Sequence, residues 1–235
     1  MQQVFIDRSL DINDRYEFDE HNAHHLKNVL KIKKDTIIRL VYQDSYLAKI
    51  EYDNNKIYAR VIEIDNNVNE LDCEVILVQS LIRKDNFELV LQKACELGVR
   101  KIITLISSRC VALDKNFDVK KLRYQKIMKS ACEQSKRNNV AVIDDVCTIN
   151  ELDVDASLKM VAFENEKYSA SKISQLYDKQ KSIVIVIGPE GGLDSQEVMA
   201  LQESGAKIVT LGKRILRTET VAFNVLSNIM YELEP

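Results

Sequence analysis

Glycine, proline and tryptophan are scarce in this chain, whose 235 residues include six glycines, two prolines and no tryptophan. Long apolar runs are also missing. The longest purely aliphatic run, Ile183–Ile187, has five residues, whereas a membrane-spanning helix needs about 20. We therefore predict no transmembrane helix. The charged stretch 1–14 lacks the apolar segment of a secretory signal, so none is predicted.

Paired cysteines are absent as well. The five cysteines are widely spaced, with no CxxC pair and no Cys/His ligand spacing. This pattern disfavours a disulfide scaffold and a zinc finger, and it predicts reduced, mostly buried thiols in a cytoplasmic protein. His21 and His25 have i, i+4 spacing but lack the glutamate of a zinc-peptidase motif. We predict no metal site. The cysteines are Cys73, Cys95, Cys110, Cys132 and Cys147.

The net charge of −3 hides two basic stretches. Residues His24–Arg39 contain five Lys or Arg against one acidic residue, and Lys115–Arg137 contain eight against two. Local basic patches on a mildly acidic protein suit a polyanionic partner. A solvated lysine-rich surface explains the same counts, so charge alone leaves both interpretations open.

The first 70 residues show β-type patterning. Tyr46, Ala48, Ile50 and Tyr52 alternate on one face of a predicted strand, and a second alternating strand spans Ile57–Val61. Asn and Asp form the turns here, because they tolerate left-handed backbone angles. We predict a small β-barrel or β-sheet domain over residues 1–70, followed by a polar linker near 65–72.

From Cys73 onward, strands alternate with helices. Apolar residues recur at helical spacing in 87–94 and 124–131, and further helices are predicted over 171–178, 195–203 and 219–233. Short apolar strands are predicted at 74–79, 101–106, 159–163, 183–187 and 207–211. This rhythm predicts an α/β domain over residues 73–235, with a mostly parallel sheet covered on both faces.

Three predicted strand ends carry the candidate chemistry. In open α/β sheets, ligands bind beyond the carboxyl ends of the strands. One strand leads into Glu164, the next into Gly188–Gly192, and the third into Gly212–Arg217 before a helix that begins near Thr218. Glycines allow a backbone to approach a ligand closely. Three glycines and a proline in one connection exceed what a plain turn needs.

The known small-ligand motifs do not fit these connections. Gly-Pro-Glu-Gly-Gly is neither a dinucleotide fingerprint nor a phosphate-binding loop of the Walker type. All three histidines lie within five residues of one another in the first domain, so no Ser-His-Asp arrangement can be built in the second. The cysteines there lack a candidate base, which disfavours cysteine nucleophilic catalysis.

Several blocks of sequence together resemble one family. They resemble the SPOUT superfamily of S-adenosylmethionine-dependent RNA methyltransferases, and more narrowly the bacterial 16S ribosomal RNA uracil-N3 methyltransferases. The blocks, spread over nearly the whole chain, are His24–Lys31, Leu89–Val99, Ser107–Arg109, Glu133–Asn138, Ile187–Leu193 and Leu211–Thr220. Three positions depart from the family pattern: Lys213 replaces proline, Cys95 replaces threonine and Lys136 replaces glycine.

The resemblance implies a fold and a cofactor. The first domain is expected to be a PUA-like β-barrel and the second a SPOUT domain with a C-terminal trefoil knot, which binds S-adenosylmethionine. Family members are homodimers. The apolar residues Val221, Val225 and Ile229 and the apolar face of the helix after Gly192 are therefore candidates for the interface, with core packing as the alternative. The expected cofactor-binding residues are Glu164, Gly188, Pro189, Glu190, Gly191, Gly192, Leu211, Gly212, Ile215, Leu216 and Thr218.

The resemblance also implies a reaction at N3 of a uridine in 16S ribosomal RNA, within the small subunit. We expect Arg217 to contact the target nucleotide and stabilise the anion that forms as N3 loses its proton; a dimer salt bridge is the alternative role. Glu164 and Glu190 are nearby carboxylates, and neither is assigned as the general base. The expected RNA-binding residues are His24, His25, Lys27, Lys31, Arg109, Lys136, Arg137 and Asn138.

Two other functions stay open at this point. One is a SPOUT enzyme that acts on another RNA base, which the N-terminal block disfavours. The other is a non-catalytic ribosome-assembly protein that binds RNA, which the intact glycine-rich connections disfavour.

Overall fold

A computed structural model of the chain describes residues 1–54, 56–111, 117–164, 170–176 and 180–234. Lys115, counted in the second basic stretch, lies outside the described residues. The chain forms two compact units. The first comprises Met1–Glu70 together with Cys132–Asn139, and the second comprises Leu71–Ala131 together with Val140–Pro235. The segment 132–139 therefore joins the N-terminal unit, although its sequence position had placed it in the α/β domain.

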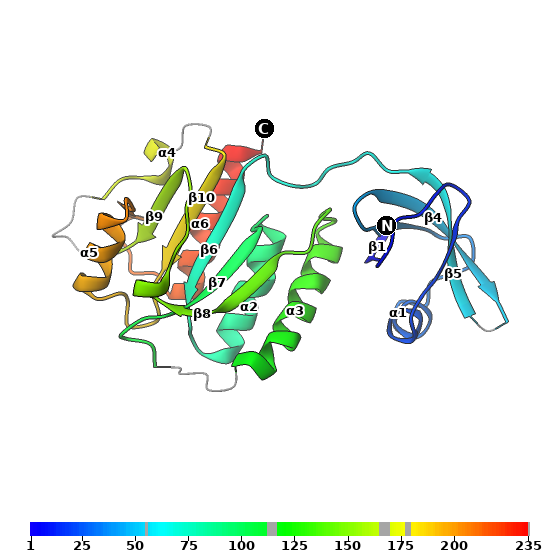
Figure 1. The fold of residues 1–235 in the computed structure, drawn as a ribbon, viewed down its shortest axis with the longest axis horizontal. Coiled ribbons are helices and arrows are strands. Elements are labelled where there is room, and N and C mark those ends of the chain that lie inside the picture. Colours follow the sequence, from blue (N-terminus) through cyan, green and yellow to red (C-terminus); the bar gives the residue numbers. More distant parts are fainter. Residues whose placement is uncertain (55, 112–116, 165–169, 177–179, 235) are drawn as a thin grey trace. The chain divides into compact units, whose positions relative to one another are not determined.

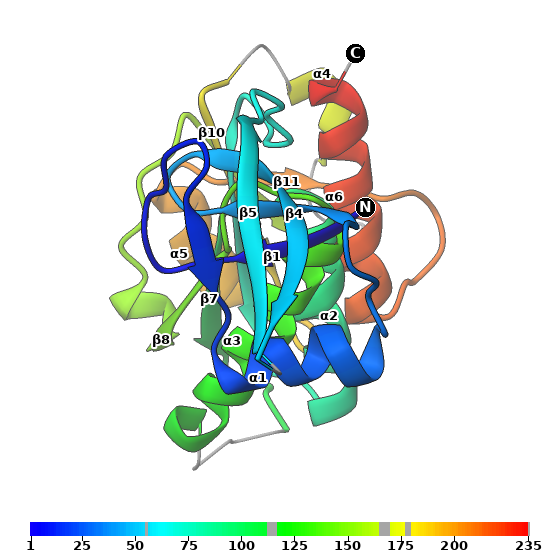
Figure 2. The same ribbon diagram turned by 90° about the vertical axis from the view of Figure 1, so that its right-hand side faces the viewer.

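The N-terminal unit is built on a five-stranded sheet with the order β1-β3-β4-β5-β2, whose long hairpin of β4 and β5 is prominent in Figure 2. β1 pairs with β3 in parallel, and the other pairs are antiparallel. The predicted alternation is confirmed, because Tyr46, Ala48 and Ile50 are all buried. The elements are β1 (Gln2–Phe5), β2 (Arg15–Glu17), α1 (Glu20–His24), the π-helical turn η1 (His25–Val29), β3 (Ile37–Val41), β4 (Ser45–Asp53) and β5 (Lys56–Ile64).

A buried arginine binds the segments of this unit together. Arg39 on β3 is 2% exposed. Its guanidinium donates to the carboxylate of Asp65, the side chains of Gln3 and Ser45, and the main-chain carbonyls of Asn67 and Lys136. The planar fork of arginine suits this role, because its five donors are held in a fixed geometry. Arg39 thus fixes residues 65–67 and the turn at 136 to the sheet.

The second unit contains a six-stranded parallel sheet with the order β11-β9-β10-β6-β7-β8. The predicted strands and long helices are present, and β8 is an edge strand that the sequence patterning did not reveal. The elements are β6 (Glu74–Ser80), α2 (Lys84–Glu96), β7 (Lys101–Ile106), α3 (Phe117–Gln134), β8 (Val142–Thr148), the 3-10 turn η2 (Ile149–Glu151), β9 (Leu158–Ala162), α4 (Ile173–Leu176), β10 (Ser182–Ile187), α5 (Ser195–Glu203), β11 (Lys207–Val209) and α6 (Thr218–Leu233).

Helices cover both faces of this sheet (Figure 1). On one face, Val198 and Leu201 of α5 pack with Val78, Ile103 and Val186 of the strands. On the other face, α2 and α6 lie in contact with each other. Burial on both faces explains why the central strands are nearly continuous runs of Val, Ile and Leu.

Lys136 occupies a backbone conformation that favours glycine. Its φ is +64°, and the turn after α3 is closed by the Arg137 N–H, which donates to the Cys132 carbonyl over 3.0 Å. This left-handed C-terminal turn is most often made with glycine. Burial lowers the pKa of Lys136, and the neighbouring Arg39 lowers it further. Lysine is therefore unfavourable here for both backbone and charge.

We predict that Lys136→Gly raises the free energy of unfolding by roughly 0.5–1 kcal/mol, because relief of the left-handed strain exceeds the added flexibility of the unfolded chain. Lys136→Ala is the matched control, since it removes the same charge but keeps a Cβ atom. Chemical denaturation measures both variants. A glycine variant no more stable than the alanine variant would contradict this account.

Candidate active site

The carboxyl ends of the parallel strands border one cleft in the second unit. Connections that follow β9, β10 and β11 line it, and the first turn of α6 closes one side. The cleft has a volume of about 730 Å³. Its lining includes Arg83, Asn86, Arg109, Glu164, Gly188, Pro189, Glu190, Gly191, Gly192, Ile215, Leu216, Arg217 and Thr218. The three predicted strand ends therefore meet at one place.

Glycine is required at one position of the connection after β10 and favoured at another. A Cβ atom on Gly188 would lie 2.8 Å from the backbone nitrogen of Leu193, which is too close for any side chain. Gly192 has a φ of +69°, and its N–H donates to the Pro189 carbonyl over 2.9 Å. A Cβ on Gly192 would meet nothing within 4 Å. The connection is thus closely packed at Gly188 and leaves free space beside Gly192.

The turn after β7 holds this connection in place. The Ser108 hydroxyl donates to the Asp194 carboxylate over 2.7 Å, and the Ser108 N–H donates to Glu197 over the same distance. The Arg109 guanidinium donates to the Gly191 carbonyl over 3.2 Å. Hydrogen bonds from the Glu197 N–H and the Ser108 hydroxyl hold the pKa of Asp194 below its usual range. Arg109, predicted to bind RNA, is placed in the cleft wall.

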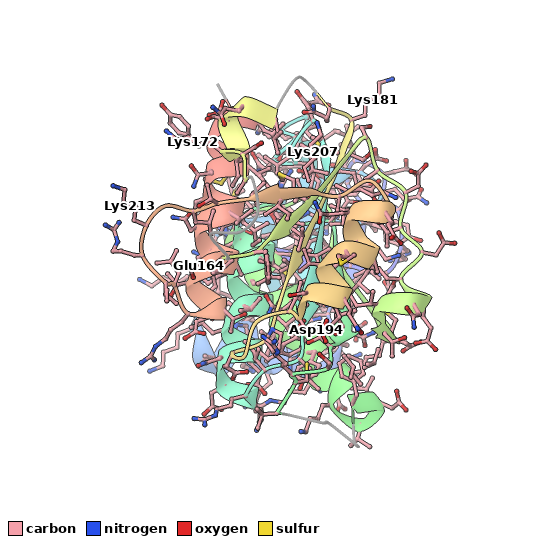
Figure 3. All side chains as sticks on the ribbon, turned by 90° about the vertical axis from the view of Figure 1, so that its left-hand side faces the viewer. Glu164, Lys172, Lys181, Asp194, Lys207 and Lys213 are labelled. Carbon is pink, nitrogen blue, oxygen red and sulfur yellow. The ribbon has the colours of Figure 1, made fainter. Side chains whose placement is uncertain are left out.

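The connection after β11 is the most exposed wall of the cleft. Gly212 has a φ of +107°, and a Cβ there would meet nothing within 4 Å. Ile215 is 85% exposed, and Lys213 projects away from the sheet (Figure 3). Leu211 and Gly212 border a smaller cavity of about 60 Å³ rather than the main cleft, which this connection lines with Ile215, Leu216 and Arg217. The connection combines apolar residues with three exposed cations, Lys213, Arg214 and Arg217. Apolar groups beside a few polar ones are typical of small-ligand sites.

Thr218, at the start of α6, is buried and hydrogen-bonded on both sides. Its hydroxyl donates to the Gly188 carbonyl over 2.7 Å, and it accepts from the Gln79 amide over 3.1 Å. Arg217 immediately precedes Thr218 and is exposed to solvent. The guanidinium of Arg217 is consequently carried by a backbone that is fixed to the neighbouring connection.

Two carboxylates lie in the cleft wall. Glu190 accepts a hydrogen bond from the Arg83 N–H over 3.2 Å, while Glu164 is exposed at the end of β9 (Figure 3). Arg83 and Asn86 are lining residues that the sequence analysis missed. Arg83 is the N-cap of α2 and Asn86 lies in its first turn, so their place between β6 and the body of α2 was the available signal, because β6 also ends at this edge.

The other predicted RNA-binding residues lie in the N-terminal unit. His24, His25, Lys27 and Lys31 are exposed on α1 and the turn that follows it. Lys136, Arg137 and Asn138 instead make hydrogen bonds or ion pairs with residues of this unit, which revises the expectation drawn from the sequence. Arg137 is 2% exposed and pairs with Glu70 over 2.7 Å; Asn138 donates to the Asn67 carbonyl; Lys136 donates to the Glu133 carbonyl.

The three residues of α6 that were candidates for a dimer interface differ in burial. Val225 and Ile229 are buried within this single chain, so for them core packing is the correct alternative. Val221 is half-buried and lines the cleft.

Among the residues that the structure describes, no group of three His, Cys, Asp or Glu side chains could hold a metal ion. None of the described helices combines the length and apolar character of a membrane-spanning segment.

Comparison with known proteins assigns the family. The RNA methyltransferase domain matches residues 69–230, and the RNA methyltransferase PUA domain matches residues 18–63. The chain belongs to the RNA methyltransferase family. The expected fold class, a parallel α/β domain with an N-terminal PUA-like domain, is therefore confirmed.

Individual relatives of this RNA methyltransferase cover most or all of its length. A Bacillus subtilis protein named ribosomal RNA small subunit methyltransferase E is 34% identical over 100% of this chain and 98% of its own. A Mesomycoplasma hyopneumoniae protein of the same name is 31% identical over 87% of this chain and 88% of its own. The crystal structure of the Neisseria gonorrhoeae protein of that name, bound to S-adenosyl methionine, is 30% identical. It has a TM-score of 0.90 and covers 99% of this chain and 98% of its own.

We predict that Gly188→Ala lowers the stability of this methyltransferase by about 1–3 kcal/mol, because the added methyl group overpacks the base of the connection. Gly191→Ala is the matched control. Its Cβ would lie 3.2 Å from the Arg109 Cβ and 3.5 Å from the Arg109 carbonyl oxygen, which is less crowded than at Gly188, so a smaller loss is expected. Thermal unfolding measures both variants, and equal losses would contradict the assigned contact.

Proposed function

We propose that this protein transfers a methyl group from S-adenosylmethionine to N3 of a uridine in small-subunit ribosomal RNA. The observation that carries the proposal is the full-length similarity to ribosomal RNA small subunit methyltransferases together with a cleft built from three glycine-bearing or carboxylate-bearing strand ends. We also propose a homodimer, a cytoplasmic location and a trefoil knot formed by the connections after β10 and β11.

The cleft fits this cofactor. Gly192 in the cleft and Gly212 in the adjoining smaller cavity have positive φ and open space where a Cβ would lie, so a ligand can approach their peptide groups. The residues that would hold the cofactor are Glu164, Gly188, Pro189, Glu190, Gly191, Gly192, Leu211, Gly212, Ile215 and Leu216. Thr218 would contribute indirectly, because its hydroxyl is already bonded to the Gly188 carbonyl and the Gln79 amide. When bound, the cofactor supplies an electrophilic methyl group on a sulfonium.

Arg217 is proposed to act on the uracil. N3 of a uracil carries a proton, so its nucleophilic form is an anion whose charge spreads onto the flanking carbonyl oxygens. Arg217 lines the cleft and is exposed, and within the described residues no carboxylate lies at ion-pair distance from it. Its guanidinium is therefore available to stabilise that charge as it develops. Glu164 and Glu190 border the same cleft, and the proton acceptor stays unassigned between them.

The N-terminal unit is proposed to bind the RNA. His24, His25, Lys27 and Lys31 form an exposed, mostly basic surface on α1 and the residues that follow, defined here as the α1 surface. Lysines that contact phosphates release counterions and make binding salt-dependent. The match of residues 18–63 to the RNA methyltransferase PUA domain supports RNA binding by the N-terminal unit and methyl transfer by the second unit.

A direct experiment uses purified protein, S-adenosylmethionine with a labelled methyl group, and small ribosomal subunits from cells that lack the protein. Digestion of the RNA to nucleosides and mass spectrometry then identify the product. Label in 3-methyluridine supports the proposal. Label in another nucleoside would replace the base assignment, and RNA binding without methyl transfer would favour an assembly protein.

We predict that Arg217→Ala lowers the single-turnover rate by roughly 10²–10³ fold, the scale for removal of one preorganised electrostatic donor. Cofactor affinity, measured by calorimetry, should change little, because the surrounding contacts come from backbone. Arg217→Lys should recover little activity, since a point charge does not reproduce the planar fork. A wild-type rate in Arg217→Ala, or loss of the dimer instead of the rate, would support the salt-bridge role.

For the α1 surface, we predict that Lys27→Ala together with Lys31→Ala weakens RNA binding and reduces the slope of log affinity against log salt by about 0.7 per lost phosphate contact. Lys181→Ala together with Lys207→Ala is the matched control. These lysines lie at the amino ends of β10 and β11, opposite the cleft (Figure 3). Equal slopes for the two double variants would contradict the assignment.

A further inference from the structure

Two polar residues interrupt the otherwise apolar face of the sheet beneath α6. Gln79 on β6 and Thr104 on β7 are both fully buried, and they are direct register partners. Side chains two residues apart on a strand share a face, so Leu77 and Ile102 precede them on this face. The two polar residues therefore stand at the end of an apolar layer, at the carboxyl edge that carries the candidate site.

Gln79 begins a chain of hydrogen bonds that leads to the cleft. Its amide nitrogen donates to the Ser80 carbonyl and to the Thr218 hydroxyl oxygen, both over 3.1 Å. Since Gln79 supplies a proton to that oxygen, the hydroxyl directs its own proton to the Gly188 carbonyl, at 2.7 Å. Three elements are joined in this way: β6, the first residue of α6 and the end of β10.

The same arrangement is unfavourable for stability. The Gln79 carbonyl oxygen and the Thr104 hydroxyl have no hydrogen-bond partner among the described residues. A buried polar atom without a partner destabilises the folded state. An apolar side chain of similar size at position 79 would remove that penalty, so stability alone does not explain glutamine here. Local conflicts of this kind are expected where a residue serves function.

We infer that Gln79 and Thr218 are positioning residues that fix Arg217 against the Gly188 connection. Arg217 is the N-cap of α6, and its side chain makes no capping hydrogen bond. The Thr218 hydroxyl therefore holds the start of the helix to the neighbouring connection, and Gln79 sets the direction of that hydroxyl. Misplacement of a catalytic group by about 1 Å can cost about 10²-fold in rate. This inference rests on the proposed function of Arg217.

The test compares four variants of the full chain: Gln79→Met, Thr218→Val, Thr218→Ser and Thr104→Val. Single-turnover methyl transfer, cofactor affinity by calorimetry and the unfolding temperature are measured for each. Gln79→Met and Thr218→Val should lower the rate about 10–100 fold and change cofactor affinity much less. Thr218→Ser keeps the hydroxyl and should retain most of the rate.

The stability readout separates positioning from a purely structural role. Gln79→Met should unfold at the wild-type temperature or above while its rate of methyl transfer falls. The substitution removes the unpartnered Gln79 Oε1 atom and also breaks the hydrogen-bond chain from Gln79 through Thr218 to Gly188, called the relay below. Thr104→Val is the matched control. It removes the adjacent unpartnered hydroxyl but leaves the relay intact, so the rate should stay at the wild-type value.

Three results would overturn the inference. One is a wild-type rate in Gln79→Met and Thr218→Val. Another is a rate loss in Thr104→Val equal to that in Gln79→Met. The third is a fall in cofactor affinity in Thr218→Val as large as the fall in rate, which would make Thr218 a direct cofactor ligand.

A failure of the proposed function is visible separately, as an inactive wild-type protein. In that case amide exchange still tests the relay. The Val221 N–H, which donates to the Arg217 carbonyl over 2.8 Å, should exchange faster in Gln79→Met than in Thr104→Val. Equal exchange in these two variants would overturn the inference.

Discussion

Parallel pairing of the strands β6, β9, β10 and β11 is the constraint on which the candidate site depends. Because each strand pairs in parallel with its neighbour, all four leave the sheet at the same edge. Connections that are far apart in sequence, after residues 162, 187 and 209, therefore come together around one cleft. An antiparallel strand in this set would carry its connection to the opposite edge and leave the cleft incomplete.

Buried polar side chains fix this arrangement at the places where distant segments meet. In the N-terminal unit, Arg39 joins β3 to residues 65–67 and to the turn at Lys136. In the second unit, Gln79 and Thr218 join β6 and α6 to the end of β10. Apolar packing supplies most of the driving force for folding but has little directional preference. Hydrogen bonds with defined donors and acceptors can instead set which backbone group faces the cleft.

Most strands, the long helices and the three connections of the candidate site could be predicted from the sequence. Ile183–Ile187 and the glycine cluster that follows it predict a buried strand and a tight connection. Apolar runs and glycines favour these structures locally, without contacts from distant parts of the chain. β8 was missed because Asp144 and Asp145, in the middle of the strand, interrupt the apolar pattern on an edge strand that is half solvated.

Tertiary contacts explain the parts that sequence patterning could not supply. Arg137 looked like one of several surface cations near the end of α3, yet its pairing with Glu70 depends on a residue 67 positions away. Gln79 looked like the polar end of a strand, and its role follows from Thr218, which is 139 positions away. Resemblance to a known family supplied the cofactor, since the connections alone show an open backbone and not which ligand fills it.

The most direct test of the account is a crystal structure of this protein grown with saturating S-adenosylmethionine. We predict electron density for the cofactor between the Gly188–Gly192 connection and residues 211–216, with the Arg217 guanidinium facing the same space. Cofactor density elsewhere on the protein, or an Arg217 turned away into an ion pair with a partner subunit, would contradict it.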